Sequence, residues 1–323
     1  MILIIMVGCY INVMVFWTYS RNLDVGVPLV IKLLSLIVYG CDNLSIFNAL
    51  LLTFIVFCPC FVFFTIVAAL LQKQTSAIVT LKSSGIDRPA KLDGKVYASY
   101  AARYEGRIVQ KLIQADGGSG DYKEVPHPFL KVWDLLKEGD VDATWVFMGW
   151  EGVEARLKGV ELNAFYLNDY DIPYAPSPVM MANPDLINSE PATVKAFLRA
   201  AARGYEFAAL QTNVQEAAEI LLAGAKAENN AELDTALVHA SQKQLSENNY
   251  YLDDNGKWGR MTENRWSKYL DWLSDSKLLT TFVQSRAPVS GVSTSLDGLR
   301  NGNSGDIIPR EKIDAKDLFV DLF

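Results

Sequence analysis

Residues 139–151 read Gly-Asp-Val-Asp-Ala-Thr-Trp-Val-Phe-Met-Gly-Trp-Glu, and this stretch decides the fold. Apolar residues alternate with Asp142 and Thr144 between Val141 and Phe147, and an alternation of this kind is typical of a β-strand. Gly139 is placed to end a helix before that strand. The stretch therefore predicts a helix followed directly by a strand.

The chain before this stretch predicts more units of the same kind. Between Pro128 and Gly139, apolar residues recur at helical spacing, which predicts a helix that begins at His127-Pro128. We expect a strand, a polar loop, a strand and a helix at residues 77–81, 83–92, 95–100 and 103–115. Strand, helix, helix and strand in this order predict an α/β protein with a mixed or parallel sheet flanked by helices.

The chain after the stretch is mostly helical. Residues 179–182 predict a returning strand, and amphipathic spacing predicts helices at about residues 189–208, 214–223, 231–247 and 263–276. Ser, Gly and Asn are frequent in residues 281–305, which predicts a surface loop.

The first 66 residues have a different composition, because they are almost continuously apolar. Residues 46–71 contain no charge and are long enough to cross a bilayer, so we expect a transmembrane helix at about residues 44–71. Residues 1–17 are a second, shorter candidate. The expected localisation is membrane-associated, with the soluble part on an undetermined side.

Charge and cysteine content exclude several classes of function. The net charge of −7 falls entirely beyond Leu71, and an acidic soluble part argues against nucleic acid as a partner. All four cysteines lie in the apolar segment, at Cys9, Cys41, Cys58 and Cys60. With only His127 and His239 besides, we expect no metal site and no histidine-based catalytic triad.

Several motifs in fixed order resemble the superfamily of sulfonate and thiamine-precursor binding proteins. They are the segments 76–86, 88–89, 92–95, 139–143 and 191–200. The resemblance implies a two-lobed fold of the type II periplasmic-binding-protein class over residues 67–323. Residues 95–174 would form the second lobe, and residues 67–94 and 175–323 would form the first. Since the apolar segment stands where the first lobe should begin, that lobe is expected to be incomplete.

Three further motifs are similar to bacterial proteins that bind thiamine-pyrimidine precursors, at residues 97–100, 145–152 and 172–174. This resemblance implies non-catalytic binding of an aminopyrimidine in thiamine biosynthesis or salvage, without a cofactor. A transporter permease is a possible partner, and the apolar N-terminal segment makes the membrane a second expected partner.

Aromatic residues in these motifs suit a flat heteroaromatic ligand, because such a ring packs between aromatic faces. The candidates are Tyr100, Trp145, Trp150 and Tyr174. For Trp145 a position in the core of the sheet is an equally good interpretation.

Polar residues in the same motifs suit the rest of the ligand. Glu151 is a candidate acceptor for ring amino groups, although a solvated carboxylate at a helix start is the alternative. The turn at Ser99 and Tyr100 leads into a helix whose free N–H groups, assisted by Arg103, are candidates for holding an anionic tail.

Two other readings of the chain stay open. Fungal thiamine pyrimidine synthases resemble the same superfamily, and that resemblance implies pyridoxal phosphate on a lysine, a nearby histidine and a cysteine-rich iron segment. The lysine and histidine would lie just ahead of Val67, where the apolar run contains neither, and the cysteines would fall at residues 175–181, which contain none. The last reading is a truncated or mis-joined chain without a function of its own.

Two local motifs predict surface structure only. The glycine-rich residues 116–121 lack the Lys and Ser or Thr of a phosphate-binding loop, so we expect a surface turn. Arg199 and Arg203 are one helical turn apart and predict a solvated helix face.

Overall fold

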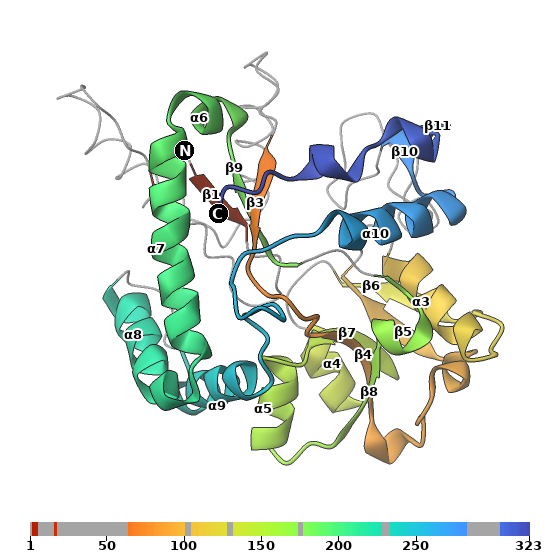
Figure 1. The fold of residues 1–323 in the computed structure, drawn as a ribbon. Helices are drawn as coiled ribbons and strands as arrows, with labels where there is room; N and C mark the ends of the chain where they lie inside the picture. The colour runs from red at the N-terminus through yellow and green to blue at the C-terminus, as the bar shows by residue number, and fades with distance from the viewer. Residues whose placement is uncertain are drawn as a thin grey trace, which may run out of the picture.

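The structure is a computed structural model that describes residues 2–5, 16–17, 64–100, 105–127, 132–173, 177–227, 233–282 and 304–323. Within these ranges the strands form a five-stranded sheet, a four-stranded sheet and a two-stranded pair, with helices packed around them (Figure 1). The predicted α/β class is confirmed.

The five-stranded sheet has the order β6-β5-β7-β4-β8. Its strands are β4 (Ser76–Leu81), β5 (Val96–Ser99), β6 (Lys123–Pro126), β7 (Ala143–Phe147) and β8 (Leu162–Tyr166). β5 runs parallel to both β6 and β7, whereas β4 runs antiparallel to β7 and β8. The sheet is therefore mixed, as the order of elements predicts.

Three helices pack on this sheet because each has an apolar face. They are α3 (Glu105–Ala115), α4 (Val132–Glu138) and α5 (Glu151–Leu157). In α3 the buried apolar residues recur at helical spacing, at Ile108, Val109, Leu112 and Ile113. These side chains and those of β4, β5 and β7 share one buried core.

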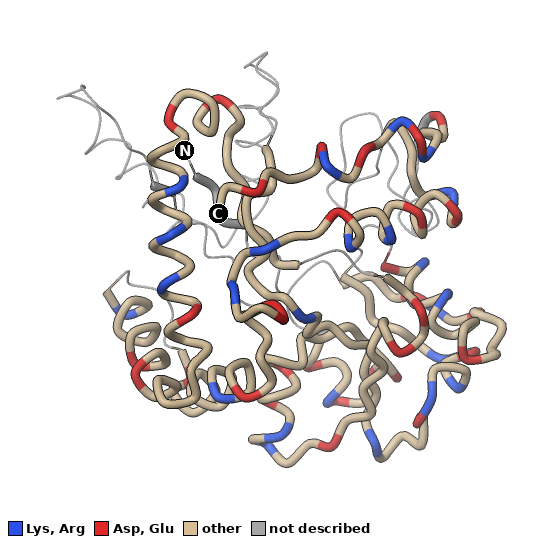
Figure 2. The backbone as a smooth tube through the Cα atoms, in the orientation of Figure 1, with Lys and Arg blue, Asp and Glu red and all other residues tan. Residues whose placement is uncertain are grey.

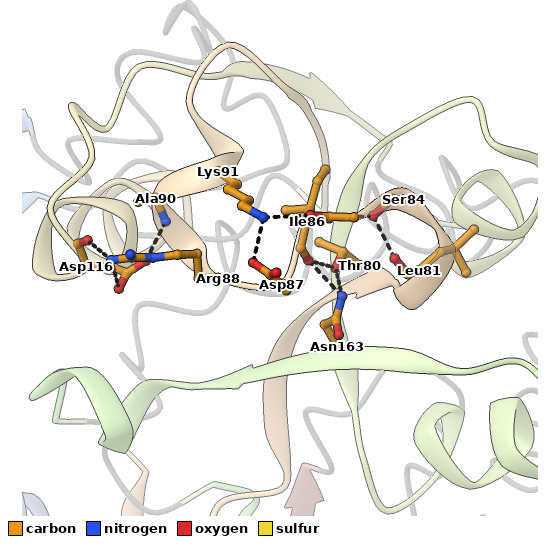
Figure 3. Close-up of polar contacts among 11 residues, drawn as sticks. Thr80, Leu81, Ser84, Ile86, Asp87, Arg88, Ala90, Lys91, Asp116 and Asn163 are labelled. Carbon is orange, nitrogen blue, oxygen red and sulfur yellow. Dashed lines mark hydrogen bonds and ion pairs between the residues drawn. The ribbon is translucent and has the colours of Figure 1, made fainter.

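The connection from β4 to β5 is short of regular structure and is held by polar contacts instead (Figure 3). Arg88 makes a bidentate ion pair with Asp116 at the end of α3, with both nitrogen–oxygen distances 2.8 Å. The carbonyl of Ile86 accepts from Thr80 Oγ1 at 2.7 Å and from Asn163 Nδ2 at 2.8 Å. These bonds attach the connection to β4, β8 and α3.

The four-stranded sheet has the order β2-β1-β9-β3. Its strands are β1 (Ile2–Ile5), β2 (Phe16–Trp17), β3 (Thr65–Ala69) and β9 (Val179–Ala182), and all neighbours are antiparallel. The helices α6 (Pro184–Ser189) and α7 (Pro191–Ala209) follow β9. Val194 and Leu198 of α7 pack with β3, β9 and Trp258 in a second core.

The remaining elements are α8 (Val214–Ala227), α9 (Thr235–Glu247), α10 (Glu263–Asp275), β10 (Thr280–Phe282) and β11 (Ser304–Ile307). α9 contacts α5 and α7, and α10 carries a third core. Trp272 of α10 packs against both this third core and the core of the five-stranded sheet. One side chain therefore links two cores.

Lys195, Arg199 and Arg203 are exposed on α7, and Figure 2 shows basic residues along this helix. The predicted solvated face is confirmed.

The structure differs from the sequence-based expectation in several elements. The two ends of residues 281–305, expected to be a surface loop, belong to the paired strands β10 and β11. β4 was expected to belong with the first lobe, but it lies inside the five-stranded sheet between β7 and β8. The chain therefore passes from the four-stranded sheet to the five-stranded sheet between β3 and β4. β6 and β8 were not predicted at all. Both are edge strands, and neither shows a clear alternation of apolar and polar residues.

The expected membrane segments fall mostly outside the described residues. Where the structure does describe them, the expectation of a helix is wrong: Thr65–Ala69 is the strand β3, and strands begin and end the candidate at residues 1–17. No helix of the described part is long and apolar enough to span a bilayer.

Candidate functional site

One edge of the five-stranded sheet brings most of the predicted site residues together. Because β5, β6 and β7 are parallel, their carboxyl ends meet at one edge, and the antiparallel β4 begins there. Ser99 and Tyr100 end β5, while Trp150 and Glu151 follow β7. Ser76, the first residue of β4, lies directly across from Phe147, the last residue of β7. Ligands of open α/β sheets bind at this kind of edge.

The turn from β7 into α5 is fixed from outside by α9. Ser241 Oγ donates to the carbonyl of Gly149 at 2.6 Å, and Gln244 Nε2 donates to the carbonyl of Met148 at 2.8 Å. A Cβ atom at Gly149 would lie 3.2 Å from Leu245 Cδ2, so the turn packs closely on α9. Trp150 is thereby held at the start of α5.

Glu151 is the most unusual residue at this edge, because its carboxylate is buried with 1% of the residue exposed. Oε2 accepts from the backbone N–H of Phe147 at 2.9 Å, whereas Oε1 has no hydrogen-bond partner among the described residues. Burial raises the pKa of Glu151 from 4.5 to about 7, although the backbone hydrogen bonds act against the rise. Since the residue is buried, the alternative of a solvated carboxylate is wrong.

The turn at Tyr100 was expected to offer free N–H groups to a ligand, but the N–H of Tyr100 is already bonded within the protein. That N–H donates to Oε1 of the buried Glu105 at 3.1 Å, and Tyr97 Oη donates to the same oxygen at 2.8 Å. Residues 101–104, which would supply the other N–H groups, lie outside the described residues, so the predicted site for an anionic tail stays a prediction.

The other predicted residues have mixed positions. Ser99 is fully buried, and Trp145 is buried in the core of the sheet with its strand neighbour Ile78, as the alternative interpretation stated. Trp150 is half-buried. Arg103 and Tyr174 lie outside the described residues, and their predicted roles stay predictions.

A cleft of about 690 Å³ opens beside this edge, and sequence reasoning missed it. None of the predicted site residues is among the residues that line it. Its lining comes from three segments far apart in the sequence, residues 72–76, 166–173 and 250–268. The aromatic members are Tyr166 and Tyr250, and the polar members include Gln72, Gln74 and Asn168. Its size is that of a small-molecule site.

The glycine-rich loop at residues 116–121 binds an internal anion. The carboxylate of Asp93 accepts from the backbone N–H groups of Ser119, Gly120 and Asp121 and from Ser119 Oγ, at 2.5 to 3.0 Å. Burial acts to raise the pKa of Asp93, but these bonds outweigh it and lower the pKa. The loop is thus a surface turn, as predicted, with its donors already used.

The described residues supply no ligands for the iron of the synthase alternative. Residues 177–181 contain no cysteine, histidine or acid, and no described cluster of three or more His, Cys, Asp or Glu side chains is placed to hold a metal. The expected positions of the lysine and histidine precede Val67 and fall largely outside the described residues.

The chain is similar to known binding proteins in sequence. Residues 64–213 match the sequence model of the family described as "NMT1/THI5 like". A formylaminopyrimidine-binding protein of Halalkalibacterium halodurans is 23% identical over 208 residues, which cover 64% of this chain and 62% of that protein. The predicted resemblance to the sulfonate and thiamine-precursor binding-protein superfamily is confirmed.

Solved structures share the fold only loosely. The periplasmic nitrate-binding protein NrtA of Synechocystis PCC 6803 has a TM-score of 0.44 at 14% identity, covering 67% of this chain and 60% of that one. The ligand-binding component of an ABC-type import system from Staphylococcus aureus has a TM-score of 0.45 at 12% identity, covering 67% and 68%. The type II periplasmic-binding-protein class stays a prediction.

Proposed function

We propose, from the match to the NMT1/THI5-like family, that this protein binds an aminopyrimidine of the kind used as a thiamine precursor, without catalysing a reaction. The name of the related formylaminopyrimidine-binding protein supports this ligand class. The observation that carries the proposal is the buried carboxylate of Glu151, whose Oε1 lacks a partner among the described residues.

An aminopyrimidine supplies what this carboxylate lacks. Its exocyclic amino group donates hydrogen bonds, and a bond to an ionised acceptor is about twice as strong as a neutral one. A buried acceptor without a partner costs about 1 to 3 kcal/mol, so an amino donor at Oε1 would remove that cost. Trp150, half-buried beside Glu151, supplies an aromatic face for the ring.

The cleft lies close to this edge of the sheet. Ser76 lines the cleft, and its strand partner Phe147 donates its N–H to Glu151. The cleft and the carboxylate are therefore separated by one pair of neighbouring strands, β4 and β7. Tyr166 and Tyr250 add aromatic surface on the cleft side.

Calorimetric titration with formylaminopyrimidine tests the proposal. We expect saturable binding by the unmodified protein, and binding weaker by roughly tenfold or more in Glu151→Gln, which loses the charged acceptor. Glu161→Gln is the matched control, because the Glu161 side chain is exposed and forms an ion pair with Lys82 at 3.6 Å. Affinity should increase as the pH rises through about 7, since an amino donor favours the ionised Glu151.

A methylpyrimidine without the amino group serves as the control ligand and should bind more weakly. Equal affinity for the two ligands, or an unchanged affinity in Glu151→Gln, would show that the carboxylate does not recognise an amino group.

A further inference from the structure

Arg265 is a cation in the cleft that has no acidic partner in the part of the chain that the structure describes. It lies in the first turn of α10, is half-buried, and lines the cleft together with Gln72. Among the described residues no carboxylate lies within ion-pair distance of its guanidinium group, whose only recorded bond runs from Nη1 to Gln72 Oε1 at 3.2 Å. Desolvation lowers the pKa of Arg265, but an arginine stays charged at neutral pH.

Three other arginines of the described chain are paired with aspartates. Arg88, Arg260 and Arg310 make ion pairs of 2.7 to 2.9 Å with Asp116, Asp321 and Asp271. A half-buried charge without such a partner costs free energy that a ligand of opposite charge can offset. Arg107 and Arg265 are half-buried and pair with a glutamine instead of an acid among the described residues, and of these two Arg265 is the one that lines the cleft.

Gln72 holds this guanidinium group in place. Its Nε2 donates to the carbonyl of Arg260 at 2.9 Å, which leaves Oε1 to accept from Arg265. The backbone N–H of Gln72 donates to the carbonyl of Tyr250 at 2.7 Å, so both ends of Gln72 are fixed. An arginine has five N–H donors, and one is used here. The others have no recorded contact with the described residues, so a bidentate contact with an oxyanion could use them.

The remaining charges of the cleft favour one small anionic group at this position. Lys268 lies three residues after Arg265 on α10, a spacing that places the two on neighbouring parts of the helix surface. The acids of the lining, Asp169, Asp253 and Asp254, come from other segments. Asp253 already accepts from the N–H groups of Asn255 and Lys257 within its own turn.

We propose that Arg265, held by Gln72, binds the carboxylate or phosphate group of a small ligand in this cleft. Planar guanidinium groups match both oxyanions through paired N–H···O bonds. The inference does not rest on the aminopyrimidine, and it assigns a site on α10 that the sequence motifs do not include.

Titration with inorganic phosphate and with acetate, at constant ionic strength maintained with chloride, tests this site. We expect at least one of the two anions to bind saturably to the unmodified protein. Arg265→Gln should weaken that binding by roughly tenfold or more. Arg199→Gln is the matched control because Arg199 is exposed on α7 and does not line the cleft. Phosphate binding tighter than acetate would indicate a phosphate ligand, and the reverse a carboxylate.

A second variant separates loss of the site from loss of the fold. Arg265→Lys keeps the positive charge but not the paired donors, so it should bind more weakly than the unmodified protein and more tightly than Arg265→Gln. Circular dichroism of each variant checks that it is folded. If neither anion binds the unmodified protein, or if folded Arg265→Gln or Arg265→Lys binds as tightly as it does, the proposal is overturned.

Discussion

Glu151 should make the stability of this protein depend on pH in a specific direction. Its pKa is raised by burial from 4.5 to about 7, a change of about 2.5 in pKa. Each pKa unit corresponds to about 1.4 kcal/mol, so ionising Glu151 in the folded protein costs about 3 kcal/mol of stability. Because the folded state holds its proton longer than the unfolded state, the stabilisation is complete below pH 4.5. It is lost as the pH rises to about 7.

The variant Glu151→Gln removes this titration while keeping an oxygen that can accept from Phe147 N–H. The free energy of unfolding is measured by urea denaturation, followed by tryptophan fluorescence, at several values from pH 4 to pH 8. All other groups titrate in both proteins, so they cancel in the difference between the two. We expect that difference to shift by about 3 kcal/mol in favour of the variant as the pH rises.

Glu161→Gln is again the control, because the Glu161 side chain is exposed and its substitution leaves Glu151 in place. A difference for Glu151→Gln that does not change with pH would refute the reasoning, since it would mean that Glu151 ionises in the folded state as easily as in the unfolded one.

Three further substitutions test other contacts, each by urea denaturation. Asp93→Asn should destabilise the protein by about 2 kcal/mol near neutral pH, because it loses charged hydrogen bonds. Since the pKa of Asp93 is lowered from 3.8, that contribution should fade below about pH 4. Asp121→Asn is the control, and equal stabilities of Asp93→Asn and the unmodified protein would contradict the role of Asp93. Ser241→Ala should cost about 1 to 2 kcal/mol because it leaves the carbonyl of Gly149 without its donor, and no loss would mean that α9 does not hold the turn at Trp150. Trp258→Ala should lower the free energy of unfolding by about 4 kcal/mol. The ring is buried, stacks on Tyr205 at a centroid distance of 4.6 Å and donates to the carbonyl of Leu70. A loss below about 1 kcal/mol would show that this core repacks.

Helices with clear apolar spacing could be predicted from the sequence, and edge strands could not. The stripe through Ile108 and Leu112 predicted α3, because burying one face of a helix leaves a regular pattern. β6 contains Lys123 and Pro126 and is half-exposed, so its position depends on pairing with β5 and not on its own residues. Pairing between distant segments leaves no local pattern to recognise.

The candidate site could be predicted only in part for the same reason. The motifs pointed to Glu151, but its burial results from the packing of the turn against Ser241, some ninety positions later in the chain. Arg265 carries no motif and looks like any charged residue of an amphipathic helix. The position of its guanidinium group depends on Gln72, which is 193 positions away in the sequence and lies beside it in the fold.

The chain passes between the two larger sheets in residues 70–75, from β3 to β4, and again after β8 on the way to β9. Gln72, Lys73 and Gln74 of the first passage and Pro173 of the second also line the cleft. A rotation of one sheet against the other would have to turn backbone bonds in these residues, and so would change the shape of the cleft. A molecule bonded to both passages would then act as a brace between the sheets, so that binding and the relative motion of the two halves become a single equilibrium.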